Sequence, residues 1–255
     1  MATVLNRRRP AASEEKFFFT MACAMAVVIV AGFSVNLALG RSSFAVPLIY
    51  HIHAFVFFGW VALYLAQSGL IASRNRLLHR RLGWLSVLWV PAMVVLGTAM
   101  IVVSMRRTGG PFFFAQNEFL ISNPLLLLCF AGLVGTALAQ RRYTGWHRRM
   151  MFVAMAILTG PGFGRLLPMP FLIPWAWWIS IAASLIFPAI AIGRDIHRNG
   201  HIHPAWFWSV GAVLATQGVA DLIAYSDAGV TFTRGVLEGS PGADRPMEAF
   251  LPAGL

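Results

Sequence analysis

Charged residues are scarce in this 255-residue sequence: they make up 11% of it, whereas hydrophobic residues make up 58%. A soluble domain normally carries about 25% charged residues, so the composition excludes an ordinary soluble fold. Lysine is almost absent, because Lys16, which precedes the first apolar segment, is the only one. A retinal protein needs a lysine within a helix to form its Schiff base. The sequence therefore excludes a rhodopsin of that type.

Cysteine is also rare, with only Cys23 and Cys129, and both lie inside apolar runs. They are typical of small buried hydrophobic residues rather than of a disulfide or a metal-binding pair. The sequence has no glycine-rich phosphate loop, no nucleophile elbow, no Cys-x-x-Cys pair and no His-Glu-x-x-His helix. No single motif therefore identifies a reaction.

Long apolar segments dominate what is present. Seven of them are long enough to cross a bilayer as helices of about 20 residues: 17–39, 46–72, 83–105, 120–140, 150–167, 175–193 and 205–226. We expect an all-α integral membrane bundle of seven transmembrane helices. The first run is too long for a signal-peptide core, so we interpret it as a retained helix. The expected parts are a basic N-terminus (1–16), a transmembrane domain (17–226) and a loosely ordered tail (227–255).

The basic residues are distributed unevenly between the two sides of these segments. Fourteen of the twenty lie in the N-terminus and in the loops after the second, fourth and sixth segments. Such an excess marks the cytoplasmic side, so we expect a cytoplasmic N-terminus and a periplasmic C-terminus in a bacterial inner (plasma) membrane. The net charge of +11 is then explained by anchoring to lipid headgroups. It does not indicate a nucleic-acid partner.

Two cytoplasmic loops end in the same tripeptide, His-Arg-Arg, at 79–81 and 147–149. This match is consistent with a duplicated helical hairpin or with independent charge anchoring. His79 and His147 stand at matched depth, as the two axial ligands of haem b require. Arg80, Arg81, Arg148 and Arg149 would neutralise the haem propionates. The alternative is that these residues only bind phospholipid headgroups.

A second group of polar residues is expected near the outer surface. Arg165 and Asp221 lie about 22 and 24 Å from the inner ends of their helices at 1.5 Å per residue. Because an unpaired charge inside a membrane costs several kcal/mol, we predict an Arg165–Asp221 ion pair or a shared wet cavity. His53, Asn36 and Gln217 have similar heights.

The segment 160–165 interrupts the fifth helix with glycine and proline. Irregular backbone at membrane depth lines a cavity or is buried in protein, and such breaks mark binding sites in transporters. A quinone headgroup or a small anion would fit such a cavity. The alternative is a structural salt bridge beside a proline kink.

Three histidines near the sixth loop, His197, His201 and His203, have no assigned role. In an extended loop His201 and His203 would share a face and could bind a metal at the cytoplasmic surface. A polar loop in front of a helix with Pro204 near its first turn is the favoured explanation.

The segment Leu77–Gly83, following a helix that carries His53, resembles an uncharacterised group of bacterial polytopic inner-membrane proteins that share a His-Arg-x-x-Gly turn. The layout more distantly resembles the ascorbate-reducible two-haem transmembrane cytochromes b. That resemblance implies that His79 and His147 form a ligand pair and that His53 matches another ligand. The segment 120–140 has no histidine, so the resemblance implies at most one haem.

These observations favour an inner-membrane protein that binds haem b or a quinone in a redox role. Two alternatives stay open: a small-molecule transporter, and an accessory or assembly subunit without chemistry of its own. The expected partners are the lipid bilayer and either a quinone or another membrane protein.

Overall fold

The chain folds into a bundle of helices in the computed structural model, which describes residues 11–252. No strand occurs within that range. The helices are α1 (Ala11–Ala38), α2 (Leu48–Ala72), α3 (Arg76–Gly83), α4 (Leu85–Thr108), α5 (Gln116–Ala139), α6 (Thr144–Ile157), α7 (Gly160–Leu166), η1 (Met169–Leu172), α8 (Ala176–Asn199), α9 (Pro204–Ala224), α10 (Asp227–Leu237) and η2 (Pro241–Asp244). The expected all-α class is confirmed.

Six of these helices are long and apolar enough to cross a membrane: α1, α2, α4, α5, α8 and α9. This is the pattern of a multi-pass membrane protein. Their ends follow the apolar runs closely. The run 46–72, for example, becomes α2 from Leu48 to Ala72.

The remaining apolar segment, expected over 150–167 with an interruption at 160–165, is divided just before those residues. It begins earlier, at Thr144, and forms α6 and the short α7 with Leu158 and Thr159 between them. Thr159 is fully buried, and its hydroxyl donates to the carbonyl of Ala156 at 2.6 Å. Pro161 stands in the first turn of α7. A backbone N–H at that position would have no hydrogen-bond partner within the helix, so proline is tolerated there.

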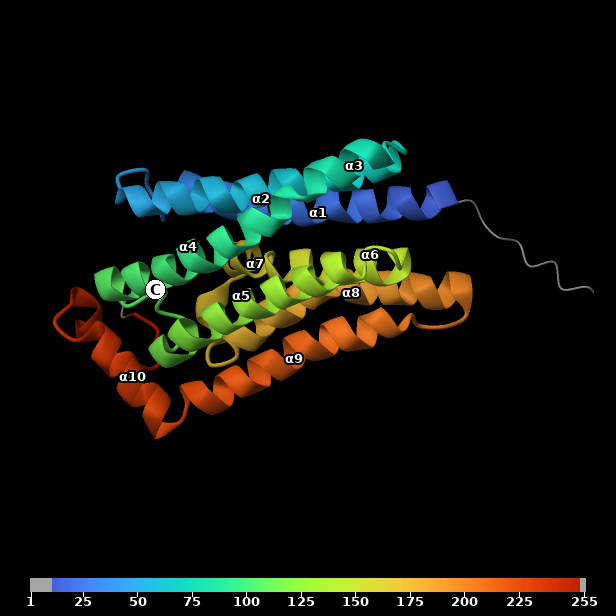
Figure 1. Ribbon diagram of the computed structural model, residues 1–255. Helices are drawn as coiled ribbons and strands as arrows, with labels where there is room; N and C mark the ends of the chain where they lie inside the picture. The colour runs from blue at the N-terminus through green and yellow to red at the C-terminus, as the bar shows by residue number, and fades with distance from the viewer. Residues whose placement is uncertain (1–10, 253–255) are drawn as a thin grey trace, which may run out of the picture.

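Helices α1, α2 and α4 lie beside one another, and α5 packs against α4, α6 and α9 (Figure 1). Helix α7 packs on α1 through two glycines. A Cβ added to Gly32 would lie 2.5 Å from the carbonyl oxygen of Gly162, and one added to Gly162 would lie 2.8 Å from that of Val28. Small residues allow such close helix approach in membranes, so these glycines bring the two backbones into contact.

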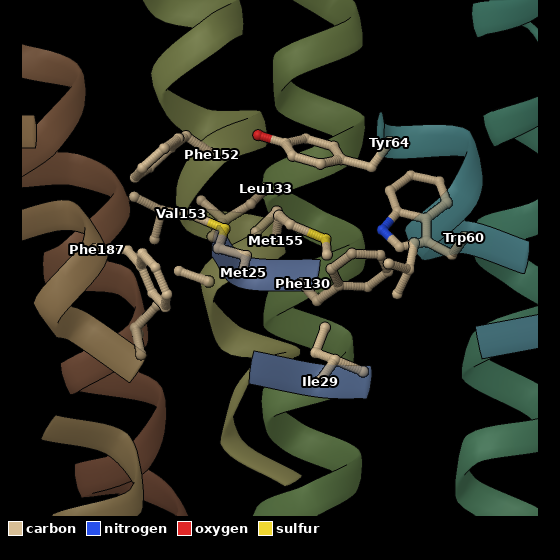
Figure 2. Packing of buried hydrophobic residues seen from close by; sticks show 14 of the residues in the cluster. Met25, Ile29, Trp60, Tyr64, Phe130, Leu133, Phe152, Val153, Met155 and Phe187 are labelled. Carbon is tan, nitrogen blue, oxygen red and sulfur yellow. The ribbon is translucent and has the colours of Figure 1, made fainter. Parts of the chain in front are cut away.

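The core lies where these helices meet, and aromatic and sulfur-containing side chains fill it (Figure 2). Trp60 and Phe130 pack edge to face with ring centroids 5.3 Å apart. Met25 and Met155 are buried beside them. This core joins α1 and α2 to α5 and α6 about halfway along the bundle. The polar groups described below lie nearer the two ends of the bundle.

The C-terminal segment differs from the expected loosely ordered tail. Ser226 caps α10 by accepting a hydrogen bond from the N–H of Gly229 at 3.1 Å. Further on, the carbonyl of Met247 accepts from the N–H of Gln116 at 2.7 Å. These hydrogen bonds and the packing of α10 against α4, α5 and α9 hold the segment in a regular structure. Its composition alone did not indicate this. The tail closes one end of the bundle (Figure 1).

The basic loops gather at the opposite end. Helix α3, the start of α6, the end of α8 and the start of α9 all lie there (Figure 1). The histidines His79 and His147 are therefore at the same end of the molecule, as their depth predicted.

Candidate functional site

His79 and His147 occupy equivalent positions on two separate helices. Each is the fourth residue of its helix, α3 in the first case and α6 in the second. Their ring centroids lie 6.3 Å apart with an interplanar angle of 84°. The fold therefore brings together two imidazoles that are 68 positions apart in the sequence.

The surroundings favour the neutral form of the His79 ring. Burial and the charge of His147 lower the pKa of His79, and the backbone of Gln67 offsets part of the shift. Nδ1 of His147 lies 2.8 Å from the carbonyl oxygen of Ala137. If Nδ1 carries the proton, as a carbonyl partner requires, Nε2 keeps a free lone pair. Nδ1 of His79 is buried without a hydrogen-bond partner.

The four arginines beside these histidines differ in whether they are already paired with a carboxylate. Arg80 and Arg81 are exposed. Arg148, in contrast, donates to the carboxylate of Glu14 on α1. Arg149 is buried against Asp195. Of these four arginines, only Arg80 and Arg81 on α3 therefore have no carboxylate partner among the described residues.

A buried ion pair that the sequence did not reveal lies next to the histidines. Arg149 donates to one carboxylate oxygen of Asp195 through Nε at 2.9 Å and through Nη2 at 2.7 Å. The indole Nε1 of Trp206 donates to the same oxygen at 2.7 Å. Both charged side chains are at most 4% exposed. The group joins α6, α8 and α9. The sequence signal that could have indicated it is a pair of opposite charges, with Arg149 just before the segment 150–167 and Asp195 just after the segment 175–193.

The predicted Arg165–Asp221 ion pair was wrong. Nη1 of Arg165 donates to the carbonyl of Pro161 at 2.8 Å, and its guanidinium lies 4.0 Å from the centre of the Phe33 ring. The reason is lateral placement, since α7 packs on α1 whereas α9 packs on α5. The outer polar residues therefore form two separate groups.

The first outer group surrounds Arg165. His53 stacks on Phe57 with centroids 4.1 Å apart, and its buried Nδ1 has no hydrogen-bond partner. Arg165 lies over Phe33, and Phe33 packs edge to face on Phe58 of α2 with ring centroids 5.4 Å apart, so Arg165 approaches the helix that carries His53. Asn36 is half-buried near the end of α1, and its backbone carbonyl accepts from the N–H of Arg41 at 2.9 Å.

The second outer group surrounds Asp221. Its carboxylate accepts from Nε1 of Trp178 at 3.0 Å and from Nε2 of Gln217 at 2.5 Å. Gln217 is fully buried and also donates to the hydroxyl of Ser122 at 3.2 Å. Glu118 is 6% exposed and stands one turn before Ser122 on α5. Sequence reasoning missed Glu118, since the expected helix began at residue 120.

The histidines of the α8–α9 loop have local structural roles. Nδ1 of His203 accepts from the N–H of Ala205 at 3.1 Å and so caps α9. Nδ1 of His201 lies 2.9 Å from the carbonyl oxygen of Asn199. Within residues 11–252, no three or more His, Cys, Asp or Glu side chains are grouped so that they could hold a bare metal ion. The loop is therefore explained by capping and turn formation.

Comparison of the chain with protein-family models, curated proteins and solved structures found no match.

Proposed function

We propose that this chain is a redox protein of a bacterial inner membrane and that it holds one haem b between His79 and His147. The observation that carries the proposal is the approach of the two imidazoles to 6.3 Å between centroids. A metal ion bonded to two opposed imidazole nitrogens at about 2.0–2.1 Å each places the ring centres about 6 Å apart. The two side chains therefore have the spacing that bis-histidine ligation needs.

The protonation of the two rings supports the same proposal. A metal ligand must be a neutral imidazole, and burial lowers the pKa of His79. The contact of His147 Nδ1 with the Ala137 carbonyl resembles the outer hydrogen bond that orients most metal-bound histidines. A bound haem would supply one-electron transfer.

The arginine environment refines the expected propionate contacts. Arg80 and Arg81 are exposed and have no carboxylate partner among the described residues, so these two are suited to pair with propionates. Arg148 and Arg149 would instead hold the α6 end of the site in position through Glu14 and Asp195.

The proposal includes the topology predicted from the sequence. Helices α6 and α7 together form a seventh, interrupted span, because residues 144–166 cover about 34 Å at 1.5 Å per residue and the hydrocarbon core is about 30 Å thick. The N-terminus is cytoplasmic and the C-terminus periplasmic. The histidine pair then lies near the cytoplasmic surface.

Optical spectroscopy of point variants tests the haem assignment. We expect a reduced-minus-oxidised haem spectrum from the detergent-purified protein and its loss in His79→Ala and in His147→Ala. His51→Ala is the matched control, since His51 is exposed at the other end of α2, and its spectrum should equal that of the wild type. An unchanged signal in both site variants would exclude the proposal.

A second candidate function is transport of a small anion past Arg165. It is favoured by the absence of a carboxylate partner for Arg165 among the described residues and by the buried, unpartnered Nδ1 of His53 beside it. A quinone headgroup would use the same two side chains. Under this alternative Arg165→Ala abolishes uptake and leaves any haem spectrum unchanged. An accessory or assembly subunit would instead co-purify with a larger complex in mild detergent.

A further inference from the structure

A cleft of about 650 Å³ lies between α10 and the C-terminal tail, at the end of the bundle opposite the histidine pair (Figure 1). This volume is within the range of about 300–1,000 Å³ that is usual for small-molecule sites. The polar and charged lining residues used below are Thr231, Arg234 and Glu238 from α10, Gln116 from α5, and Arg245 and Glu248 from the tail.

The tail forms a fixed wall of this cleft. Arg245 donates to three backbone carbonyls between α4 and α5. The backbone N–H of Gln116 donates to the carbonyl of Met247 at 2.7 Å, and its amide Nε2 donates to the carbonyl of Gly242 at 2.9 Å. These bonds hold the tail on both sides of the cleft residues, so the cleft is formed before any ligand arrives.

Helix α10 supplies the facing wall. Thr231, Arg234 and Glu238 follow one another at spacings of three and four, so they share one side of the helix. Thr233 and Leu237 are buried on its other side and attach α10 to the bundle. The helix therefore directs a polar surface toward the tail.

Four charged side chains line the cleft without being paired. Arg234, Arg245, Glu238 and Glu248 take part in no salt bridge within residues 11–252. Arg234 and Glu238 stand four residues apart, where opposite charges on a helix commonly pair, and still form none. Two positive and two negative groups therefore face one small volume with their charges uncompensated.

Arg245 is the most constrained of the four. Burial lowers its pKa to about 10, so the guanidinium stays charged at neutral pH. Its partners are neutral carbonyls, and its Nε is buried without a hydrogen-bond partner. A carboxylate is the stronger partner for a guanidinium, because charge-assisted hydrogen bonds are about twice as strong as neutral ones.

We infer that this cleft binds a small zwitterion, a free amino acid or a short peptide, whose carboxylate pairs with Arg234 and Arg245 and whose ammonium pairs with Glu238 and Glu248. A simple anion would meet two carboxylates in the cleft, and a simple cation would meet two guanidinium groups. Like charges brought together in a binding site cost affinity. A ligand that carries both charges satisfies all four side chains.

The inference goes beyond the proposed haem site and does not depend on it. The cleft and the histidine pair lie at opposite ends of the bundle (Figure 1), so a colourless protein would still bind the zwitterion. Under the proposed topology the cleft opens to the periplasm.

Direct binding to the full-length protein in detergent tests the inference with trialanine, N-acetyl-trialanine and trialanine amide. These probes share their side chains and differ in which end is charged. We expect one trialanine per chain by equilibrium dialysis and an unfolding temperature that rises and saturates with trialanine, because a ligand that binds only the folded state stabilises it. Blocking either end should weaken binding by about tenfold or more, because one pair of charged side chains then lacks its partner.

L-Alanine, measured beside these probes, distinguishes the two sources of the zwitterion. An affinity equal to that of trialanine assigns the cleft to free amino acids, and a weaker affinity assigns it to short peptides.

Variants assign the ligand to this cleft. Arg234→Gln should weaken trialanine binding by about tenfold and leave the affinity for trialanine amide unchanged, because the amide has no carboxylate to lose. Glu238→Gln should weaken trialanine binding and leave that of N-acetyl-trialanine unchanged. Both residues are exposed, so both variants should fold.

Arg41→Gln is the control, since Arg41 is an exposed arginine in the loop between α1 and α2, and it should bind as the wild type does. Three results would each overturn the inference: no binding of trialanine or L-alanine by the wild type, equal affinity for the charged and the blocked probes, or unchanged trialanine affinity in both site variants.

Discussion

At the scale of single residues, the Arg149–Asp195 pair shows how buried charge constrains this protein. Both side chains are at most 4% exposed, and the indole of Trp206 donates a hydrogen bond to Asp195. Removing one partner of a buried pair leaves the other charge uncompensated and costs about 3–5 kcal/mol. The pair therefore fixes the relative positions of α6, α8 and α9 rather than merely adding stability.

Asp195→Ala should accordingly lower the free energy of unfolding by about 3–5 kcal/mol, as measured by denaturant titration in detergent. Glu15→Gln is the control: its partner Arg76 is 74% exposed and 3.8 Å away, so its loss should change stability by less than about 0.5 kcal/mol. The double variant Arg149→Met/Asp195→Leu should recover most of the loss, because an apolar replacement of both partners leaves no orphaned charge. Equal effects of Asp195→Ala and Glu15→Gln would contradict this account.

His203 gives a prediction about pH. Burial and the charge of Arg149 lower the pKa of folded His203, which Asp195 partly opposes. The unfolded chain therefore binds more protons below about pH 6.5, the ordinary histidine value, and the folded state loses stability as the pH falls. A protonated His203 also cannot accept the hydrogen bond from Ala205 that caps α9.

His203→Asn separates these effects, because asparagine caps a helix without titrating. We expect the unfolding temperature of the wild type to fall more between pH 7.5 and pH 5 than that of the variant. Identical pH profiles for the two proteins would show that His203 does not contribute.

At the scale of helices, the interrupted α6–α7 segment is explained by close packing. Gly162 approaches α1 so closely that an added Cβ would lie 2.8 Å from the Val28 carbonyl oxygen and 3.1 Å from Cα of Ile29. The glycines of this segment were expected to accompany a cavity or a kink. The structure shows that one of them instead permits contact between two backbones.

Gly162→Ala should lower stability by about 1–3 kcal/mol, the usual cost of overpacking. Gly164→Ala is a close control on the same helix, since an added Cβ there has no atom within 4 Å. It should be neutral or stabilising by up to about 1 kcal/mol, because alanine reduces the freedom of the unfolded chain. Thermal unfolding of both variants measures these changes in stability. A loss of stability in Gly164→Ala as large as that in Gly162→Ala would refute the packing explanation.

The helices could be predicted from the sequence because membrane-spanning runs are apolar throughout. The contacts between the ends of the helices could not be predicted in this way. Glu118 and Asp195 lie two residues outside expected helix ends and were not singled out, and Arg149 was expected to neutralise a haem propionate or to bind a headgroup. All three are buried. Equal depth correctly placed His79 beside His147. It failed for Arg165 and Asp221, because depth does not specify which helices are neighbours.

At the scale of the whole molecule, polar groups occupy both ends of the bundle and an apolar core separates them. The histidine pair and the basic loops lie at one end, and the group around Asp221 lies at the other, beneath α10. The C-terminal tail belongs to this second end, where Arg245 donates to the backbone carbonyls of Gly109, Phe112 and Phe114. In a membrane the two ends would face opposite compartments.

Cysteine labelling tests that orientation. In a background without Cys23 and Cys129, a cysteine introduced as Glu248→Cys should react with a membrane-impermeant thiol reagent in intact cells. A cysteine introduced as Arg76→Cys, at the α3 end, should react only after the cells are permeabilised. The reverse pattern would invert the proposed topology, and labelling of both in intact cells would contradict it.

The haem content of the purified wild-type protein tests the central claim most directly. The account predicts one haem b per chain, because His79 and His147 are the one pair of histidine rings in contact within residues 11–252. A preparation from haem-replete cells that contains no haem, or that contains two haems per chain, would contradict it.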